Sequence, residues 1–403
     1  MFDKIEMAPA DPILGLSEAF KADPNPEKIN LGVGVYKDAN GATPILACVK
    51  AAEERLAKEE TTKGYLPIDG DGRYGAHVQK LLFGEGSEII LSGRAATSHT
   101  PGGTGALRVA GDFIKANLPG AKLWVSDPTW ANHAAVFGAA GVEVKKYAYY
   151  DAASSGLNFE GMIESLKTID AGDVVLLHGC CHNPTGVDPT LQQWTQIAAV
   201  VAEQGGIPLV DFAYQGFAEG VLEDSVGLHE VANANKELIV CSSFSKNFGL
   251  YNERVGALTI VAKDADEAKK VQSQVKVTIR RNYSNPPCHG GAIVRTVLDD
   301  EGLSKQWLDE LAAMRDRING MRTSLTRELD SRGVKLNPAG NGFIAGQRGM
   351  FSFSGLTKEQ VGVLKAEHSI YIVGSGRINV AGITENNIAR LCDAIAAVTQ
   401  AAV

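Results

Sequence analysis

The chain has 403 residues, with 47 acidic and 39 basic side chains and a net charge of −8 at pH 7. This length exceeds the usual size of one hydrophobic core, so two domains are expected. Apolar residues make up 44% and charged residues 21%, as in ordinary globular enzymes. No clustered Lys/Arg run occurs, which argues against nucleic acid as the main partner but leaves small anionic substrates open.

The first six residues, MFDKIE, lack the apolar core of a signal peptide, and no run approaches the roughly 18 apolar residues that span a bilayer. The six cysteines form no C-x-x-C pair and are expected to be thiols in a reducing compartment. Cys180 and Cys181 precede His182, but adjacent cysteines match no common zinc spacing, so no metal is predicted. We expect a cytoplasmic protein without contact to a membrane.

Short aliphatic and β-branched runs alternate with helical patterns through the middle of the chain. The expected strands are residues 122–126, 142–147, 173–178, 207–212, 237–241 and 256–262. Helical patterns lie at residues 107–118, 160–169 and 191–204. Near-continuous apolar strands that alternate with amphipathic helices predict an α/β fold, with a largely parallel sheet covered by helices on both faces.

Residues 304–332 show apolar spacings of three and four and end before Gly333. A helix of about 29 residues spans roughly 43 Å at 1.5 Å per residue. Such a helix is expected to cross from one domain to the other, with a kink near Gly320. The segments after it are assigned to a smaller domain, together with the amino-terminal segment.

A glycine-rich turn, PGGTGA at residues 101–106, precedes a helical pattern. Glycines at a helix start let backbone N–H groups approach an anion, which the helix dipole also favours. Asp127 lies about twenty residues further on, as in a dinucleotide fingerprint, but Arg108 stands where that motif needs glycine. A phosphate site needs further groups beside the turn. Candidates for these groups are Ser243, Ser245 and Arg254.

Lys246 follows the apolar run 238–240 and lies among hydroxyl residues in SSFSKNFGLYNERVG, residues 242–256. Taken alone, a lysine in a polar loop is more often exposed to solvent. A lysine at the mouth of a strand, with hydroxyl groups and a guanidinium nearby, suits a covalent imine to a phosphorylated aldehyde.

Further polar and aromatic residues follow the ends of expected strands. Asp211 should lie at the carboxyl end of a parallel strand, where α/β folds place their sites. A carboxylate there can keep a pyridine nitrogen protonated, although a helix cap or salt bridge is the commoner role. Asn183 and Tyr214 can hydrogen-bond a phenolate oxygen. Trp130 can stack on a flat ring, although a core tryptophan is the default.

Two arginines suit a dicarboxylic substrate. Arg377 lies in SGRINVAG and Arg280 in RRNYSNPP. Arginine holds a carboxylate through two parallel hydrogen bonds, so a pair of arginines can bind two carboxylates. Each alone is more often a surface or ion-pair residue, and a shift of one position would give the role of Arg280 to Arg281.

Together these segments resemble the class I aminotransferases that use pyridoxal 5′-phosphate, in particular the aspartate and aromatic amino acid aminotransferases. The motifs that carry the resemblance are PGGTGA, DPTWANH, CHNPTG, DFAYQGF, SFSKNFGLYNERVG, NYSNPP and SGRINVAG. The similarity runs nearly end to end, from Asn30 to Gly382. It implies fold type I of the pyridoxal-phosphate-dependent transferases. Residues 1–45 and 313–403 would then form the small domain and residues 46–312 the large one.

The resemblance also implies roles for single residues. The implied catalytic residues are Lys246, Asp211, Tyr214 and Trp130, with Lys246 bonded to the cofactor. The implied cofactor contacts also include Gly103, Thr104, Asn183, Ser243, Ser245, Arg254 and, from a neighbouring subunit, Tyr65. The implied substrate contacts are Gly34, Trp130, Asn183, Arg377 for the α-carboxylate and Arg280 for a distal carboxylate across the dimer interface. His133 and His178 are expected to support Asp211.

The implied reaction is a ping-pong transfer of the amino group of L-aspartate to 2-oxoglutarate, in a homodimer with shared active sites and a small domain that closes over the substrate. An aromatic or dual donor preference stays open, because both subfamilies keep the two arginines. The pocket-wall candidates Ile13, Val33, Tyr36 and Asn285 do not settle the donor. A non-catalytic protein that binds pyridoxal phosphate and a dinucleotide-dependent oxidoreductase are the less favoured alternatives.

Overall fold

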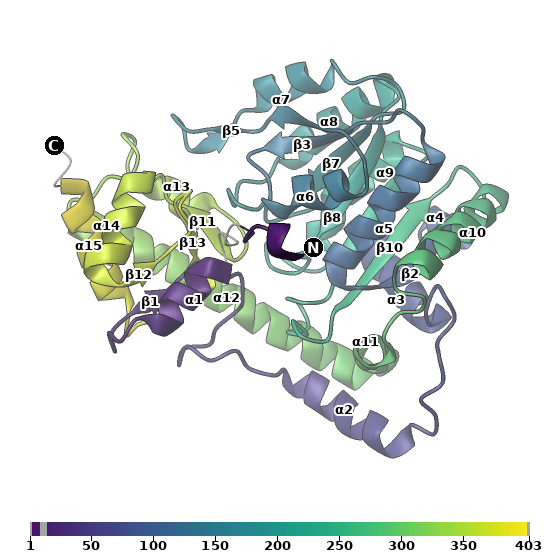
Figure 1. Ribbon diagram of the computed structural model, residues 1–403, viewed down its shortest axis with the longest axis horizontal. Helices are drawn as coiled ribbons and strands as arrows, with labels where there is room; N and C mark the ends of the chain where they lie inside the picture. The colour runs from purple at the N-terminus through teal and green to yellow at the C-terminus, as the bar shows by residue number, and fades with distance from the viewer. Residues whose placement is uncertain (1, 9–13, 401–403) are drawn as a thin grey trace.

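The chain folds around a seven-stranded, mostly parallel sheet (Figure 1). A computed structural model describes residues 2–8 and 14–400, so the wall candidate Ile13 lies outside the described residues. The strands are β2 (Ala95–Pro101), β3 (Leu123–Asp127), β4 (Val144–Ala148), β7 (Val174–His178), β8 (Ile207–Phe212), β9 (Leu238–Ser243) and β10 (Val255–Val261). Their order is β2-β10-β9-β8-β7-β3-β4. β10 pairs antiparallel with β2 and β9, and the other neighbours pair parallel.

The predicted α/β class is confirmed, and the six predicted strands match β3, β4 and β7 to β10 with small shifts at their ends. The sequence does not reveal β2, whose residues AATSHTP are mostly small or polar. Several of its polar side chains form hydrogen bonds within the sheet or with the helices that cover it. Thr97 Oγ1, for example, lies 2.9 Å from Thr259 Oγ1 on β10.

Helices cover both faces of the sheet (Figure 1). The helices of this part are α2 (Ala47–Glu59), α3 (Gly72–Phe83), α4 (Glu88–Leu91), α5 (Gly102–Asn117), α6 (Asn132–Ala139), α7 (Phe159–Leu166), α8 (Leu191–Glu203), α9 (Val226–Ala234), α10 (Ala265–Asn282) and α11 (Cys288–Asp299). Among them, α2 lies away from the sheet and packs against α11. Because side chains alternate along a strand, Val175 and Leu177 join the core that contains residues of α8, while Leu176 joins the core that contains residues of α5. The sheet is therefore buried on both faces.

Helix α12 (Glu301–Ser331) is one element of 31 residues that runs between the two parts of the molecule (Figure 1). It packs near its start against α2 and α11, and further along against α13 (Gly342–Gly346) and α15 (Ile388–Gln400). It stays helical through Gly320, where the sequence predicts a kink. This single helix therefore links the two parts of the molecule.

The smaller part contains segments from both ends of the chain. Its elements include α1 (Leu14–Ala22), β1 (Ile29–Asn30), β11 (Phe351–Phe353), α14 (Lys358–His368), β12 (Ile370–Tyr371) and β13 (Arg377–Asn379). β1 pairs parallel with β12, and β11 pairs antiparallel with β13. The domain boundaries at residues 45/46 and 312/313 stay predictions.

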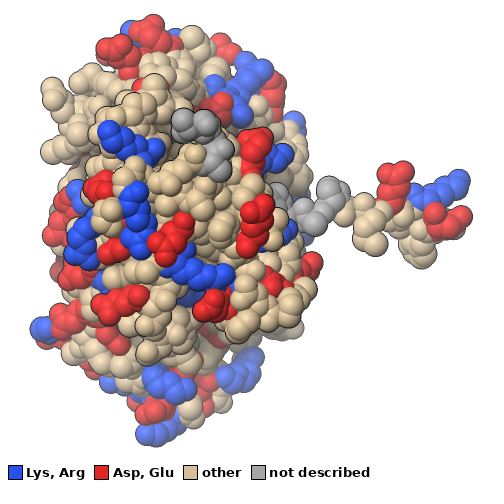
Figure 2. Space-filling view, turned by 90° about the vertical axis from the view of Figure 1, so that its left-hand side faces the viewer, with Lys and Arg blue, Asp and Glu red and all other residues tan. Residues whose placement is uncertain are grey.

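The face of the smaller part is shown in Figure 2, where acidic and basic side chains are intermixed. This face therefore presents no continuous field of one sign. Among the helices of residues 2–8 and 14–400, none is long and apolar enough to cross a membrane.

One glycine of β10 is required by a close backbone approach. A Cβ at Gly256 would lie 2.4 Å from the carbonyl carbon of Gly102 and 2.7 Å from Ser242 O. We expect Gly256→Ala to lower the free energy of unfolding by about 1–3 kcal/mol, because backbone atoms cannot yield. In the exposed α14, Gly362→Ala should instead raise it by about 0.5–1 kcal/mol. Urea unfolding at one protein concentration measures both, and an unchanged or more stable Gly256→Ala protein would contradict this packing.

Candidate active site

A cavity of about 460 Å³ opens at the carboxyl ends of β7, β8 and β9. Its size lies in the range of roughly 300–1,000 Å³ that is typical of small-molecule sites. Apart from Tyr65 and Arg280, every residue predicted to have a catalytic, cofactor or substrate contact lines it. These residues are Gly34, Gly103, Thr104, Trp130, Asn183, Asp211, Tyr214, Ser243, Ser245, Lys246, Arg254 and Arg377.

One end of the cavity is a cup built from a helix start, hydroxyl groups and a guanidinium. Helix α5 begins at Gly102 without a side-chain cap, so the N–H groups of its first turn are not used by a capping residue. Arg254 donates from Nη1 to Ser245 Oγ at 3.0 Å and to Tyr251 O at 3.1 Å. The backbone N–H of Ser245 donates to Ser243 Oγ at 3.3 Å. Such a cup suits a phosphate dianion.

Two glycines make room for this cup. Gly102 has a φ of +77°, and a Cβ there would lie 2.3 Å from Arg254 Nη2. A Cβ at Gly103 would lie 2.9 Å from Ser243 Cβ. Arg254 itself has a φ of +55°, a conformation that costs about 1–3 kcal/mol in a residue other than glycine. The surrounding contacts hold the arginine in this conformation beside the helix start.

Asp211, on β8, is buried and supplies a negative charge to the cavity. His133 Nε2 donates to Asp211 Oδ2 at 3.0 Å. Burial raises the pKa of Asp211, but the bond from His133 and the nearby charges, including Lys246, outweigh burial and hold the pKa below its usual value. The carboxylate is therefore ionised and suited to pair with a protonated ring nitrogen.

A chain of hydrogen bonds continues behind Asp211. His133 Nδ1 lies 2.8 Å from Thr129 Oγ1, which in turn lies 3.1 Å from His178 Nε2. Burial lowers the pKa of His178 to about 3, so this ring is neutral at neutral pH. The structure thus brings both predicted histidines behind Asp211. The chain orients His133 so that its Nε2 faces the carboxylate.

Lys246 follows β9 and is partly buried in the cavity. Its Nζ lies 4.7 Å from the centroid of the Tyr214 ring. Burial lowers the pKa of Lys246 to about 8, with Arg254 and Arg377 acting in the same direction and Asp211 opposing them. A fraction of Lys246 is therefore the free amine near neutral pH, the form that acts as a nucleophile or base.

Arg377, on β13, is buried and fixed on several sides. Its Nη1 donates to Asn183 Oδ1 at 3.1 Å, and its Nη2 donates to Gly32 O at 2.8 Å. The guanidinium carbon lies 4.0 Å from the centroid of the Phe351 ring. Among the described residues, Nε has no hydrogen-bond partner. A fixed guanidinium with an unpaired N–H beside a cavity suits a carboxylate.

The remaining predicted residues shape the walls. Trp130 is partly buried and meets His133 edge to face, with ring centroids 5.2 Å apart. Burial raises the pKa of Tyr214, so its hydroxyl stays protonated and can donate. At Gly34 a Cβ would lie 2.7 Å from Phe351 Cζ, so only glycine fits beside this ring.

Tyr65 and Arg280 do not reach this cavity. Tyr65 is 95% exposed, and both residues line another hollow of about 690 Å³, together with the wall candidate Asn285. Arg281 lines a different hollow with Arg108 and Lys115. The other wall candidates, Val33 and Tyr36, are not among the lining residues of the cavity.

The sequence missed several residues that line the cavity, chiefly Phe351, Tyr251 and Cys180. Phe351 belongs to a short apolar strand, FSF, and no local signal distinguishes its ring from a core side chain. Tyr251 follows Lys246 within the SFSKNFGLYNERVG motif, so proximity to the lysine was an available signal.

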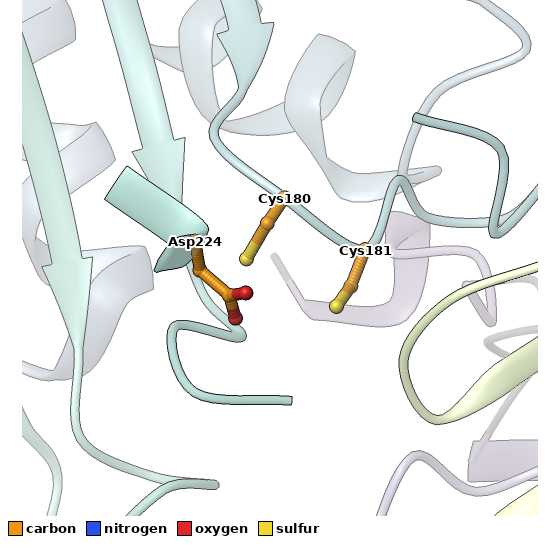
Figure 3. A group of neighbouring side chains, drawn as sticks. All are labelled: Cys180, Cys181 and Asp224. Carbon is orange, nitrogen blue, oxygen red and sulfur yellow. The ribbon is translucent and has the colours of Figure 1, made fainter. Parts of the chain in front are cut away.

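Cys180, Cys181 and Asp224 point toward one another near the strand ends (Figure 3). Asp224 accepts four backbone N–H groups, from Gly216 and Ala218 at Oδ2 and from Glu219 and Gly220 at Oδ1. Burial raises the pKa of both thiols, that of Cys181 to about 11, so both stay protonated. A carboxylate engaged by a turn and two neutral thiols bind a cation poorly. The cluster therefore has a structural explanation.

Comparisons with known proteins cover nearly the whole chain. A family model described as aminotransferase class I and II matches residues 26–395. The aspartate aminotransferase of Escherichia coli K12 is 56% identical over 398 residues, 99% of this chain and 100% of that protein. The aromatic-amino-acid aminotransferase of Pseudomonas aeruginosa is 46% identical, with 98% of each chain covered. A crystal structure of the aromatic-amino-acid aminotransferase from Burkholderia pseudomallei, covalently bound to pyridoxal phosphate, matches with a TM-score of 0.96, 49% identity and 99% of each chain covered.

The charges around Lys246 generate a test on the ligand-free protein. We expect its acetylation rate to rise with pH around a midpoint of about 8. Asp211→Asn should lower that midpoint, because Asp211 favours the charged ammonium. Asp112→Asn removes a carboxylate that pairs with Arg108 on α5 and should leave it unchanged. Peptide mass spectrometry measures the rates, and a higher midpoint in Asp211→Asn would refute this electrostatic picture.

Proposed function

The chain belongs to the class I and II aminotransferases, and we propose that it moves the amino group of L-aspartate to 2-oxoglutarate, giving oxaloacetate and L-glutamate. The enzyme is a transaminase that depends on pyridoxal 5′-phosphate. The observation that carries the proposed reaction is the meeting of Lys246, Asp211, Arg254 and Arg377 around one cavity. The 56% identity to an aspartate aminotransferase supports aspartate as the donor.

The residues of the cavity fit this cofactor. A phosphate would be held by the cup at Gly103, Thr104, Ser243, Ser245 and Arg254, where the two glycines keep space for an anion. Asp211 would pair with the ring nitrogen. The amide oxygen of Asn183 is engaged by Arg377, so its NH₂ group remains to donate to the ring oxygen together with Tyr214. Trp130 would lie against the ring.

The protein's own groups then carry the proton transfers. When bound, pyridoxal phosphate supplies an aldehyde that links to amino groups and a ring that accepts electron density from the reacting carbon. Lys246 Nζ would hold the cofactor in the resting enzyme. Once the amino group of the substrate has displaced it, the free amine can take the α-proton as a base and then donate the same proton as an acid. Its lowered pKa keeps part of it unprotonated near neutral pH. Asp211, ionised and hydrogen-bonded by His133, would keep the ring nitrogen of the bound cofactor protonated.

Arg377 orients the substrate for this proton transfer. Its unpaired Nε and its fixed position on Phe351 support a role as the clamp for the α-carboxylate. All amino acid donors share this carboxylate, so Arg377 sets the position of the α-carbon near Lys246 and does not select the side chain. The selection of a donor must therefore come from groups that meet the distal part of the substrate.

An aromatic or dual preference is the second candidate function. It is supported by the aromatic-amino-acid aminotransferase that is 46% identical and by the structural match to another at a TM-score of 0.96. A non-catalytic pyridoxal-phosphate-binding protein is disfavoured by the lowered pKa of Lys246 beside an ionised Asp211. These candidates differ in measurable turnover.

A donor panel with 2-oxoglutarate tests the substrate. We expect kcat/KM for aspartate to exceed that for phenylalanine and tyrosine by at least about tenfold. The ratio of these kcat/KM values measures how well the enzyme discriminates between the transition states of the donors. Lys246→Ala should lose about a thousandfold or more in turnover, because the anchoring amine and base are gone. Equal or larger values for the aromatic donors would replace aspartate with the second candidate function. A wild-type protein that binds the cofactor without any turnover would overturn both.

We further propose a cytoplasmic homodimer in which Tyr65 and Arg280 serve the cavity of the other copy. Support comes from the exposure of Tyr65 and from the hollow that it shares with Arg280, away from the chain's own cavity. Arg281 lines a different hollow from Tyr65, which favours Arg280 as the partner of a distal carboxylate. The six free cysteines, five of them buried, support a reducing compartment.

Alanine variants of Arg280 and of its neighbour Arg281 form a matched pair that tests which arginine binds the distal carboxylate. Arg280→Ala should lower kcat/KM for aspartate by about 10- to 100-fold, the size of a lost charge-assisted hydrogen bond pair. Its effect on phenylalanine should be much smaller, because that donor has no distal carboxylate. Arg281→Ala should change neither donor appreciably. A larger loss in Arg281→Ala would exchange the two roles.

Shared sites are tested by mixing two impaired variants of the chain. A hybrid of Lys246→Ala and Arg280→Ala chains contains one intact site if Arg280 acts across the interface. A mixture refolded at equal amounts should then recover about a quarter of the wild-type aspartate activity. Activity equal to the sum of the separate variants would show that each chain uses its own arginine.

A further inference from the structure

Arg322 is a buried cation in the last third of α12. It is only 1% exposed, although a buried charge is costly unless it is well hydrogen-bonded. Its partners are two backbone carbonyls: Nη1 donates to Phe351 O at 3.2 Å, and Nη2 donates to Gly349 O. Nε has no partner within the described residues. The hydrogen bonds that Arg322 donates from its side chain therefore all go to one short segment, residues 349–351.

That segment carries the aromatic ring on which Arg377 lies. Phe351 is 3% exposed, and its ring centroid lies 4.0 Å from the guanidinium carbon of Arg377. β11 also pairs with β13, so that Phe353 faces Arg377 in the register. The ring contributes a cation–π contact and blocks sideways movement of the guanidinium.

The same segment also lies against the large domain. Gly349 has a φ of +79°, and a Cβ there would lie 2.4 Å from Cys181 Cβ. The backbone N–H of Arg348 donates to Gly186 O at 2.6 Å. Residues 349–351 are thus fixed on one side by the large domain and on the other by Arg322. Without Arg322, two buried carbonyls would lose their donors, and the segment would shift.

We propose that Arg322 is a positioning residue for the α-carboxylate site, acting through the Gly349–Phe351 backbone and the Phe351 ring on Arg377. This inference rests on the proposed function, because Arg377 is taken there as the carboxylate clamp. Arg322 touches neither substrate nor cofactor. Its effect should therefore appear in the binding of every carboxylate substrate alike and leave the cofactor cup unchanged.

The first experiment compares Arg322→Met with Arg322→Lys and with Arg315→Met. We expect Arg322→Met to raise KM for aspartate, phenylalanine and 2-oxoglutarate by about tenfold each, with kcat changed less and the dissociation constant for pyridoxal phosphate unchanged. Arg322→Lys keeps a charged donor and should restore part of the affinity. Arg315, on the same helix, donates to Gly216 O at 3.1 Å, so Arg315→Met is a matched loss and should leave KM unchanged.

The route through Phe351 is tested by a double-variant cycle. Phe351→Leu should raise the same KM values. The double variant Arg322→Lys/Phe351→Leu should raise KM by less than the product of the two single fold-increases, because both changes act through the same contact. Calorimetric titration with succinate, an unreactive dicarboxylate, gives the same comparison as a dissociation constant without turnover. This titration keeps the inference testable if Arg322→Met does not fold, because Arg322→Lys and Phe351→Leu suffice.

Unchanged KM and succinate affinity in folded Arg322 variants, or effects that multiply fully in the double variant, would overturn the positioning role. A different result, the absence of transamination by the wild-type protein, would overturn the proposed function. Succinate binding remains measurable in that case and still reports on Arg322 and Phe351.

Discussion

The opposed charges of Asp211 and Lys246 are the constraint on which the rest of the site depends. They come from neighbouring strands, since Asp211 lies near the end of β8 and Lys246 follows β9, and adjacent strands lie about 4.8 Å apart. Burial would neutralise each group alone, because it raises the pKa of the acid and lowers that of the amine. Asp211 stays ionised through His133 and Lys246, while Lys246 keeps an amine that loses its proton close to neutral pH. One pair thus provides a permanent anion and a reversible base.

Anionic ligands would complete the charge balance of this cavity. Arg254 and Arg377 are each held by neutral groups, namely carbonyls, a hydroxyl, an amide and an aromatic ring. These contacts fix the guanidinium groups, and because the partners are uncharged they do not neutralise the positive charge. A protein with a net charge of −8 can therefore present a locally positive site for phosphate and carboxylate groups. The cations that lower the pKa of Lys246 are the same ones that we propose bind these anions.

The sequence predicted those parts of the site that follow directly from strand ends and glycine turns. Asp211 and Lys246 stand just after apolar runs, so their convergence follows from a parallel sheet. Contacts that depend on long-range packing were not predictable: Phe351 and Arg322 carry no motif, and they meet only because α12 passes behind β11. The strand β2 was missed because its residues, AATSHTP, form no apolar or alternating run, and its Thr97 pairs with Thr259 of β10 only in the folded sheet. The sequence also left Arg280 and Arg281 unresolved, and the helix α10 separates them because successive helical residues point about 100° apart.

The central claim is that Lys246 is the residue that holds the cofactor. The direct test is to load the protein with pyridoxal phosphate, reduce it with borohydride and map the lysine that carries the label by peptide mass spectrometry. The expected result is stoichiometric label on Lys246, and its loss when aspartate is added before reduction, because the amino donor displaces the lysine. Label on a different lysine, or a labelled Lys246 that aspartate does not release, would contradict the account.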